Sequence, residues 1–410
     1  MNLSILIDGL NKKTESRQPW SYARTIALEL CKLGENVNIF TNRQPSTSSP
    51  SIFEDNIVLH QLPVPSLSKI DAVSLSLIKE TKPNILYFFG NSLSGVYLPR
   101  LKEVDVPIIL HISSVHYSFS DLRKLSREEI WSHRLHLAVS LLPGQLLVRK
   151  LNNKMISKIT VPSNAVKSSL CKFGVRPQKI HVAPLAFQSS SKILDRSSNT
   201  FEARRSLNLP KEDFIITYLG SPNTIRGTDT LLQSARYLKK DNVHFCMLIL
   251  SRHDFEEDDS FESYLQKLIR AYELGHFVKI VSGTLSKRVV DDYIEASNLL
   301  VFPFKIVQSE PPLSVLEALG LGKPVIVTNK CGLPELVTPD TGFLVKPNDP
   351  HGLANTIYLC TQNPDMLAKM GERAKICTSV LPSYEVLGRW TQDLLSQTTS
   401  QFVLHKKNNV

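Results

Sequence analysis

Residues 309–337 read SEPPLSVLEALGLGKPVIVTNKCGLPELV, and this stretch decides the fold assignment. An acid, Glu310, precedes two prolines, and apolar residues at helical spacing begin at Leu313. Two glycines end the predicted helix, and an apolar run after Pro324 predicts a buried strand. This order of loop, helix and buried strand is typical of a parallel α/β sheet.

The predicted helix carries groups that can hold a nucleotide. The first-turn amides, at Leu313 and Ser314, have no partner within the helix and lie at the positive end of its dipole, so they favour a phosphate group. Glu317 lies one turn further on, where a carboxylate can accept hydrogen bonds from two adjacent hydroxyls, such as those of a ribose. Many α/β proteins without such a site have a similar helix, so periodicity alone leaves both interpretations open.

Similar units repeat along the chain, on both sides of a polar, serine-rich segment near residue 191. The expected strands are 3–7, 36–40, 57–62, 85–89, 108–112, 158–161, 179–183, 214–219, 245–250, 278–281, 299–302, 324–328 and 343–345. The expected helices are 21–33, 228–238, 261–274, 287–296, 313–321, 350–360, 365–378 and 384–396. This rhythm predicts two doubly wound, Rossmann-like domains, 1–190 and 201–375, with a linker over 191–200 and a helical tail over 376–400.

The composition excludes several classes of protein. Apolar residues make up 42% of the chain and charged residues 21%, which is ordinary for a globular protein. No uncharged apolar run approaches the roughly 18 residues of a membrane-spanning helix, and the N-terminus lacks the pattern of a secretory signal. The six cysteines show no C-x-x-C spacing, which argues against a zinc ribbon or a disulfide framework. We therefore expect a cytoplasmic protein.

The positive charge is confined to one half of the chain. Residues 1–200 carry a net charge of +11 and residues 201–410 carry −1, which indicates an anionic partner for the first half. Within residues 120–160, eight Lys and Arg residues are interleaved with leucines and valines. Such a cationic amphipathic segment can bind anionic lipid, and a solvated helix packed on its own domain fits equally well. No nucleic-acid-binding motif accompanies these cations, so we expect no nucleic-acid partner.

The stretch at 309–337 resembles the nucleotide-sugar signature of the family 4 retaining glycosyltransferases, which have the GT-B fold. The family shows a Glu, a second Glu followed by Ala in a helix, Gly-Lys-Pro-Val and Gly-x-Pro-Glu. In this chain the motifs are Glu310, 317–318, 322–325 and 332–335, and weaker similarities lie at 160–166, 217–220, 226–227, 282–284, 298–303 and 342–345. The resemblance implies two domains that face a central cleft, with the helix 384–396 crossing back to the first domain.

The resemblance also implies a role for each motif residue. Glu317 would bind the donor ribose, and Glu310 would touch the donor sugar. The backbone amides of Leu313 and Ser314 would hold the diphosphate. Arg226 takes the place of the family's lysine and would neutralise the leaving diphosphate, so Arg226 and Glu310 are the catalytic candidates. The expected donor is a UDP- or GDP-sugar, with no cofactor and no metal.

Two departures from the family pattern lie in the second half. Six residues separate Glu310 from Glu317, whereas the family usually has seven, so Glu310 is expected to be displaced. Ser221 stands where the family often has an arginine directly after the strand glycine. One of two phosphate-binding cations would then be missing.

Two further departures lie in the first half. The first βα loop is poor in glycine and instead contains Lys12 and Lys13, which either contact phosphate or belong to a solvated turn. Ser113 occupies the place of a histidine that the family often has, and His111 lies two residues earlier. His111 either lines the cleft or is a strand histidine whose hydrogen bonds are satisfied within the fold.

Two functions therefore fit the sequence. The first is a retaining glycosyltransferase, expected to transfer a hexose to a lipid-linked, glycan or other acceptor, in the cytoplasm or peripherally at the inner membrane face. The second is a GT-B-shaped protein that binds a nucleotide or a partner with little or no transfer. Ser221 and the glycine-poor first loop favour the second.

Overall fold

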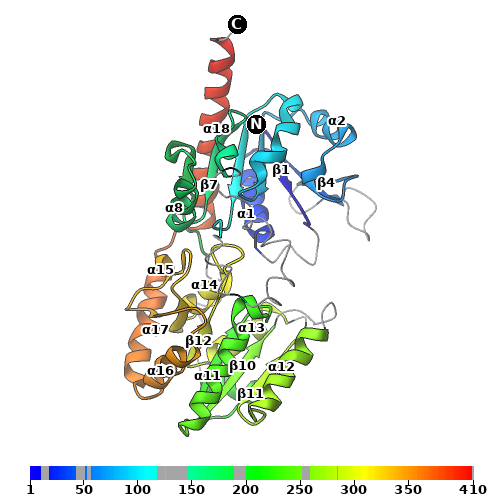
Figure 1. The fold of residues 1–410 in the computed structure, drawn as a ribbon. Helices are drawn as coiled ribbons and strands as arrows, with labels where there is room; N and C mark the ends of the chain where they lie inside the picture. The colour runs from blue at the N-terminus through cyan, green and yellow to red at the C-terminus, as the bar shows by residue number, and fades with distance from the viewer. Residues whose placement is uncertain are drawn as a thin grey trace. The chain divides into compact units, whose positions relative to one another are not determined.

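The computed structural model describes residues 1–10, 18–42, 51–52, 57–117, 125, 146, 148–188, 200–251, 259–283 and 285–408 (Figure 1). Its contacts divide the chain into two compact units. Unit 1 comprises Met1–Gln188, Gln308–Pro311 and Pro382–Val410, and unit 2 comprises Ser189–Val307 and Pro312–Leu381. Each unit contains one sheet, so the expectation of two parallel α/β domains is confirmed.

The sheet of unit 1 has the strand order β3-β4-β2-β1-β5-β6-β7-β8. Its neighbours pair in parallel except β3 and β4, which are antiparallel. The strands are β1 (Asn2–Ile7), β2 (Asn36–Asn42), β3 (Ser51–Ile52), β4 (Val58–Leu62), β5 (Ile85–Gly90), β6 (Ile108–Ile112), β7 (Ile156–Val161) and β8 (Ile180–Val182).

Helices cover both faces of this sheet, which explains the near-continuous apolar strands. The helices are α1 (Trp20–Lys32), α2 (Ala72–Glu80), α3 (Ser94–Tyr97), α8 (Asn164–Lys172) and α18 (Tyr384–Lys407), with 3₁₀ turns η1 (Leu67–Lys69), η2 (Leu98–Val104), η3 (Arg149–Asn152) and η4 (Pro177–Lys179). Leu3, Ile5 and Ile7 of β1 share a core with α1 and α18, whereas Leu6 shares one with α2 and α8.

Helix α18 lies beside α1 on the first of these faces (Figure 1). Gly388 allows this close approach, because a Cβ atom there would lie only 2.5 Å from Cβ of Glu29. The described residues from Pro382 onward thus belong to unit 1, with the N-terminal part of the chain, although they follow unit 2 in sequence.

The sheet of unit 2 is entirely parallel, in the order β11-β10-β9-β12-β13-β14. Its strands are β9 (Phe214–Leu219), β10 (Phe245–Leu250), β11 (Val278–Val281), β12 (Leu299–Phe302), β13 (Val325–Thr328) and β14 (Gly342–Val345). Its helices are α10 (Thr200–Ser206), α11 (Thr228–Lys240), α12 (Asp259–Ala271), α13 (Lys287–Ala296), α14 (Leu313–Gly320), α15 (Leu333–Leu336), α16 (Pro350–Thr361) and α17 (Pro364–Ser379), with a 3₁₀ turn η5 (Thr224–Arg226).

The structure differs from the sequence prediction mainly in short elements and boundaries. Helices α2, α3, α8, α10 and α15 were not among the expected elements. The tail expected over 376–400 is divided, because α17 continues to Ser379 and α18 begins at Tyr384 and runs to Lys407. The linker over 191–200 lies outside the described residues, except Thr200, which begins α10.

Among the helices that the structure describes, none combines the length and apolar composition needed to span a membrane.

Candidate functional site

The loops after β9 and β12 form the candidate site at the carboxyl edge of the unit 2 sheet, where parallel α/β sheets bind ligands. The backbone N–H groups of Lys305 and Ile306 both donate to the carbonyl of Ile225. Gly227 has φ +77°, and a Cβ atom there would lie 1.9 Å from the carbonyl oxygen of Pro303. These contacts bring the residue before Gly227, Arg226, close to the loop that leads to α14.

Arg226 ends η5, which Asn223 caps by accepting from the Arg226 backbone N–H at 2.9 Å. Its guanidinium lies 5.9 Å from the ring of Phe304, and its Nη1 would lie 3.2 Å from a Cβ atom at Gly220. Burial raises the pKa of the neighbouring Tyr218 to about 12, so this phenol stays neutral. Within the described part of the chain, no carboxylate forms an ion pair with Arg226, and its charge is therefore available to an anion.

The first turn of α14 provides hydrogen-bond donors at the same sheet edge. Pro312 is its N-cap residue and has no side chain that can cap the helix. The backbone N–H groups of Leu313 and Ser314 have no hydrogen-bond partner among the described residues. Free first-turn amides at the positive end of the helix dipole can bind an anionic oxygen.

Glu317 lies one turn into α14, and its side chain is 13% exposed. Its Oε1 lies 3.9 Å from Nζ of Lys287, the first residue of α13. The same ammonium donates to Asp291 at 3.1 Å. The carboxylate of Glu317 is therefore partly exposed, and the cation near it, Lys287, also contacts Asp291.

Glu310 lies in a different environment from the other motif residues. The segment Gln308–Pro311 belongs to unit 1, whereas Leu313, Ser314 and Glu317 belong to unit 2. The backbone N–H of Glu310 donates to the carbonyl of Ser113 at 2.7 Å, and its buried carboxylate accepts a hydrogen bond from Ser163. The structure thus brings Glu310 together with Ser113, a pairing that the sequence did not predict.

His111 is enclosed rather than open. Its ring stacks on Tyr22 with centroids 4.7 Å apart and lies 4.9 Å from Phe89, while Nδ1 contacts the hydroxyl of Thr160 at 3.1 Å. Burial lowers the pKa of His111 to about 3, so the imidazole is neutral at physiological pH. This arrangement favours a satisfied histidine of the strand over a residue that lines a cleft.

The remaining sequence candidates contribute less. Lys12 and Lys13 lie outside the described residues. Ser221 provides its carbonyl to the hydroxyl of Tyr218 at 3.1 Å and adds no cation. Lys305, which sequence reasoning missed, is buried and pairs with Asp229 at 2.7 Å, so it stabilises the loop after β12.

Sequence reasoning also missed Lys287, Ser163 and Tyr22. Both Lys287 and Ser163 contact motif acids through long-range packing. Ser163 lies in the family-like segment 160–166, which assigned it no role, and nothing in the sequence indicates the contact of Lys287. Tyr22 was part of an expected helix, but nothing in its spacing indicates the stacking on His111.

Two sequence profiles match the chain. "Glycosyl transferases group 1" matches residues 199–376, and "Glycosyltransferase Family 4" matches residues 20–187. The putative colanic acid biosynthesis glycosyltransferase WcaL of Escherichia coli (strain K12) is 28% identical over 37% of this chain and 37% of its own length. A D-inositol 3-phosphate glycosyltransferase of Corynebacterium aurimucosum is 23% identical over 86% of this chain and 85% of its own. The match to the first relative thus spans less than half of that protein.

Solved structures share the fold at low sequence identity. Sucrose-phosphate synthase from Thermosynechococcus elongatus has a TM-score of 0.78 and 18% identity, over 98% of this chain and 99% of that one. Anabaena Alr3699/HepE in complex with UDP-glucose has a TM-score of 0.71 and 14% identity, over 97% of this chain and 100% of that one. With sequence profiles that match both halves and a GT-B fold over nearly the whole length, the chain belongs to the group 1 glycosyltransferases of family 4.

Proposed function

We propose that the protein transfers a sugar, expected to be a hexose, from a UDP- or GDP-sugar to an acceptor, with retention of anomeric configuration. The observation that carries this proposal is the presence of Arg226, a cation without a carboxylate partner among the described residues, at the same sheet edge as the free first-turn amides of α14. Glycosyl transfer separates a diphosphate from the sugar, and negative charge grows on that leaving group. Arg226 and the amides of Leu313 and Ser314 would stabilise this charge, and Glu317 would bind the ribose.

The contacts of Glu310 differ from those that the family resemblance implies. The family resemblance gives it contact with the donor sugar, but its carboxylate accepts from Ser163 in unit 1. Together with the missing cation at Ser221, this contact favours a second candidate function, in which the protein binds a nucleotide with little transfer.

The two functions differ in the fate of a bound sugar nucleotide. UDP- and GDP-sugars are screened for thermal stabilisation of the protein, because a ligand that binds only the folded state raises its apparent stability. We expect one of them to stabilise the protein and to be consumed when acceptor is present, with an α-linked donor giving an α-linked product by NMR. A sugar nucleotide that binds and stays intact with every acceptor supports the second function, and no binding by any donor excludes the first.

We further propose that the acceptor carries phosphate or lies on an anionic membrane. Residues 148–188 contain eight Lys and Arg residues and no Asp or Glu, and they include η3, β7, α8 and β8 of unit 1. The relative from Corynebacterium aurimucosum acts, by its name, on D-inositol 3-phosphate, which is also a phosphate-bearing acceptor. Most of the expected membrane segment, 120–160, lies outside the described residues, which here are 125, 146 and 148–160.

The proposal of an acceptor on an anionic membrane is tested by co-sedimentation with anionic and neutral vesicles at low and high salt. Each exposed basic residue near an anionic surface contributes about 1 kcal/mol, so Lys150→Gln with Lys154→Gln should weaken binding about thirtyfold. The matched control on unit 2, Lys240→Gln with Lys279→Gln, should bind like the unmodified protein. Equal binding to both kinds of vesicle, or none to either, excludes the membrane and leaves a soluble phosphate-bearing acceptor.

A further inference from the structure

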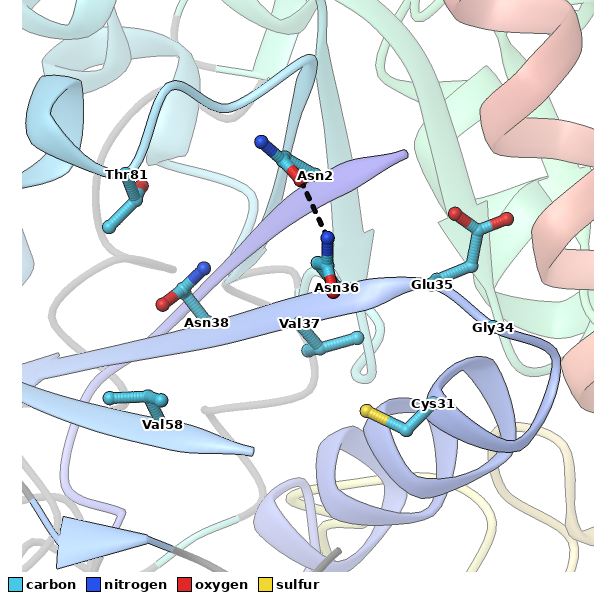
Figure 2. A pocket seen from close by; sticks show the side chains of 9 residues that line it. All are labelled: Asn2, Cys31, Gly34, Glu35, Asn36, Val37, Asn38, Val58 and Thr81. Carbon is cyan, nitrogen blue, oxygen red and sulfur yellow. Dashed lines mark hydrogen bonds between the residues drawn. The ribbon is translucent and has the colours of Figure 1, made fainter. Parts of the chain in front are cut away.

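A cavity of about 500 Å³ opens at the amino ends of β1, β2 and β4, the sheet edge opposite to the carboxyl ends (Figure 2). Its volume is in the range of small-molecule sites. The residues that line it are Asn2, Cys31, Gly34, Glu35, Asn36, Val37, Asn38, Val58 and Thr81. Parallel strands covered on both faces are usually apolar, so asparagines at positions 2, 36 and 38 are unusual here.

The hydrogen bonds of two asparagines fix the orientation of their amides. Asn2 donates through Nδ2 to the carbonyl of Lys82 at 3.3 Å, so its Oδ1 is left to accept from Nδ2 of Asn36 at 3.1 Å. Figure 2 shows this second bond between the two side chains. Asn36 therefore donates through Nδ2 to Asn2. Its acceptor, Oδ1, has no partner among the described residues.

Asn38 has the opposite orientation. Its Oδ1 lies 2.8 Å from Nε2 of His60, whose ring stacks on Phe40 at 4.6 Å. Because Oδ1 accepts from this imidazole, Nδ2 of Asn38 remains as a donor with no partner in the described part of the chain. Asn36 and Asn38 share one face of β2 and lie about 7 Å apart along the strand.

The cavity carries no net charge that would select an ion. Among the described residues that line it, none is Lys or Arg, and Glu35 is the one acid. The carboxylate of Glu35 accepts from Nε2 of Gln392 at 2.7 Å and lies 2.7 Å from the amino group of Met1. Val58 of β4, which pairs with Asn38 of β2, adds apolar surface beside the amides.

We propose that this cavity is a second binding site for a neutral, hydroxyl-rich ligand, a free monosaccharide or a sugar unit of a glycan. Ring hydroxyls both donate and accept, so one sugar ring can meet the acceptor of Asn36 and the donor of Asn38 together. The C–H groups of the ring then contact Val58. The site lies on unit 1 and does not depend on the proposed transferase activity.

The test uses saturation-transfer NMR on the full chain with glucose, galactose, mannose and N-acetylglucosamine, each alone and then with excess UDP. We expect at least one sugar to give signals that UDP does not remove. Asn38→Asp replaces the free donor by an acceptor and should weaken binding about fivefold, as expected for one lost hydrogen bond. Val58→Phe fills the cavity, leaves the amide bonds in place and should abolish the signals.

Asn408→Asp makes the same chemical change at the exposed end of α18 and serves as the control. Circular dichroism shows whether each variant is folded. If one of the two cavity variants does not fold, the result for the other decides the test. Signals that persist in Val58→Phe or are equal in Asn38→Asp and Asn408→Asp overturn the proposal. The proposal is also overturned if UDP removes all signals, or if the unmodified protein gives no signal with any sugar.

Discussion

The carboxyl edges of the two sheets have the same position in their folds but differ in how their polar groups are paired, among the described residues. In unit 2, Arg226 has no carboxylate partner and the first-turn amides of α14 are free, within the described residues. In unit 1, the corresponding edge holds His111, enclosed by aromatic rings, and Glu310, bonded to Ser163. A cation without a carboxylate partner and free amides can bind a diphosphate, whereas side chains that are already hydrogen-bonded or stacked contribute mainly to stability. The predictions below test this difference, from the largest effect to the smallest.

The strongest effect is expected at Arg226. Arg226→Ala removes the charge that would face the leaving diphosphate, so transfer should fall about 100- to 1,000-fold, as for the loss of a donor that stabilises transition-state charge. Steady-state kinetics with the donor found in the screen measure this change. Arg236→Ala is the matched control, because Arg236 stacks on Tyr272 on the exposed side of α11. Equal activity of the two variants would contradict the contrast between the sheet edges.

The second prediction concerns the backbone that positions Arg226. Gly227→Ala places a Cβ atom against the carbonyl of Pro303 in a left-handed conformation, and the free energy of unfolding should fall by about 3 kcal/mol. Gly34 has φ +84° with no atom within 4 Å of the position that a Cβ atom would take. Gly34→Ala should therefore lower the free energy of unfolding by only about 1 kcal/mol. Urea unfolding followed by circular dichroism compares the two variants. The same loss in both would mean that the contact with Pro303 is unimportant.

The third prediction sharpens the role of α14. Glu317→Ala should weaken UDP or GDP binding by about 1–3 kcal/mol through lost charged hydrogen bonds. Calorimetry with the nucleotide and with its 2′,3′-dideoxy analogue separates this role from a general loss of fold. The unmodified protein should prefer the nucleotide with the hydroxyls, and the variant should not. Glu372→Ala, at an exposed acid of α17, should bind both ligands like the unmodified protein, and an unchanged dissociation constant in Glu317→Ala would refute the assignment.

The smallest effect is expected at His111, in unit 1. Its pKa is about 3 in the folded protein and about 6.5 in an unfolded chain, so between these values the unfolded state binds the extra proton. This residue should therefore contribute a loss of stability as pH falls below about 6.5, by at most about 1.4 kcal/mol per pH unit. Denaturation from pH 7 to pH 5 should show a shallower pH dependence in His111→Gln. An identical slope would mean that His111 is charged or exposed.

The sequence by itself determined the elements whose pattern is local. Buried parallel strands are continuous apolar runs, so every expected strand corresponds to an observed one. The order of Glu310, α14 and the following glycine, lysine and proline identified the family, because a motif is a property of neighbouring residues. Short helices such as α2 and α8 were missed, although Asp71 and Ser163 cap them, whereas the similarly short α14 was found because it lies in the family motif.

Only the tertiary structure decided which distant residues share an environment. Glu310 contacts Ser163, 147 positions away, and His111 stacks on Tyr22. The amide pair of Asn36 and Asn38 faces a cavity because β1, β2 and β4 align their polar amino ends. Such contacts depend on strand order and on helix packing over the sheet. Residue spacing along the chain does not predict these contacts, whereas consecutive residues show the period of a helix or a strand directly.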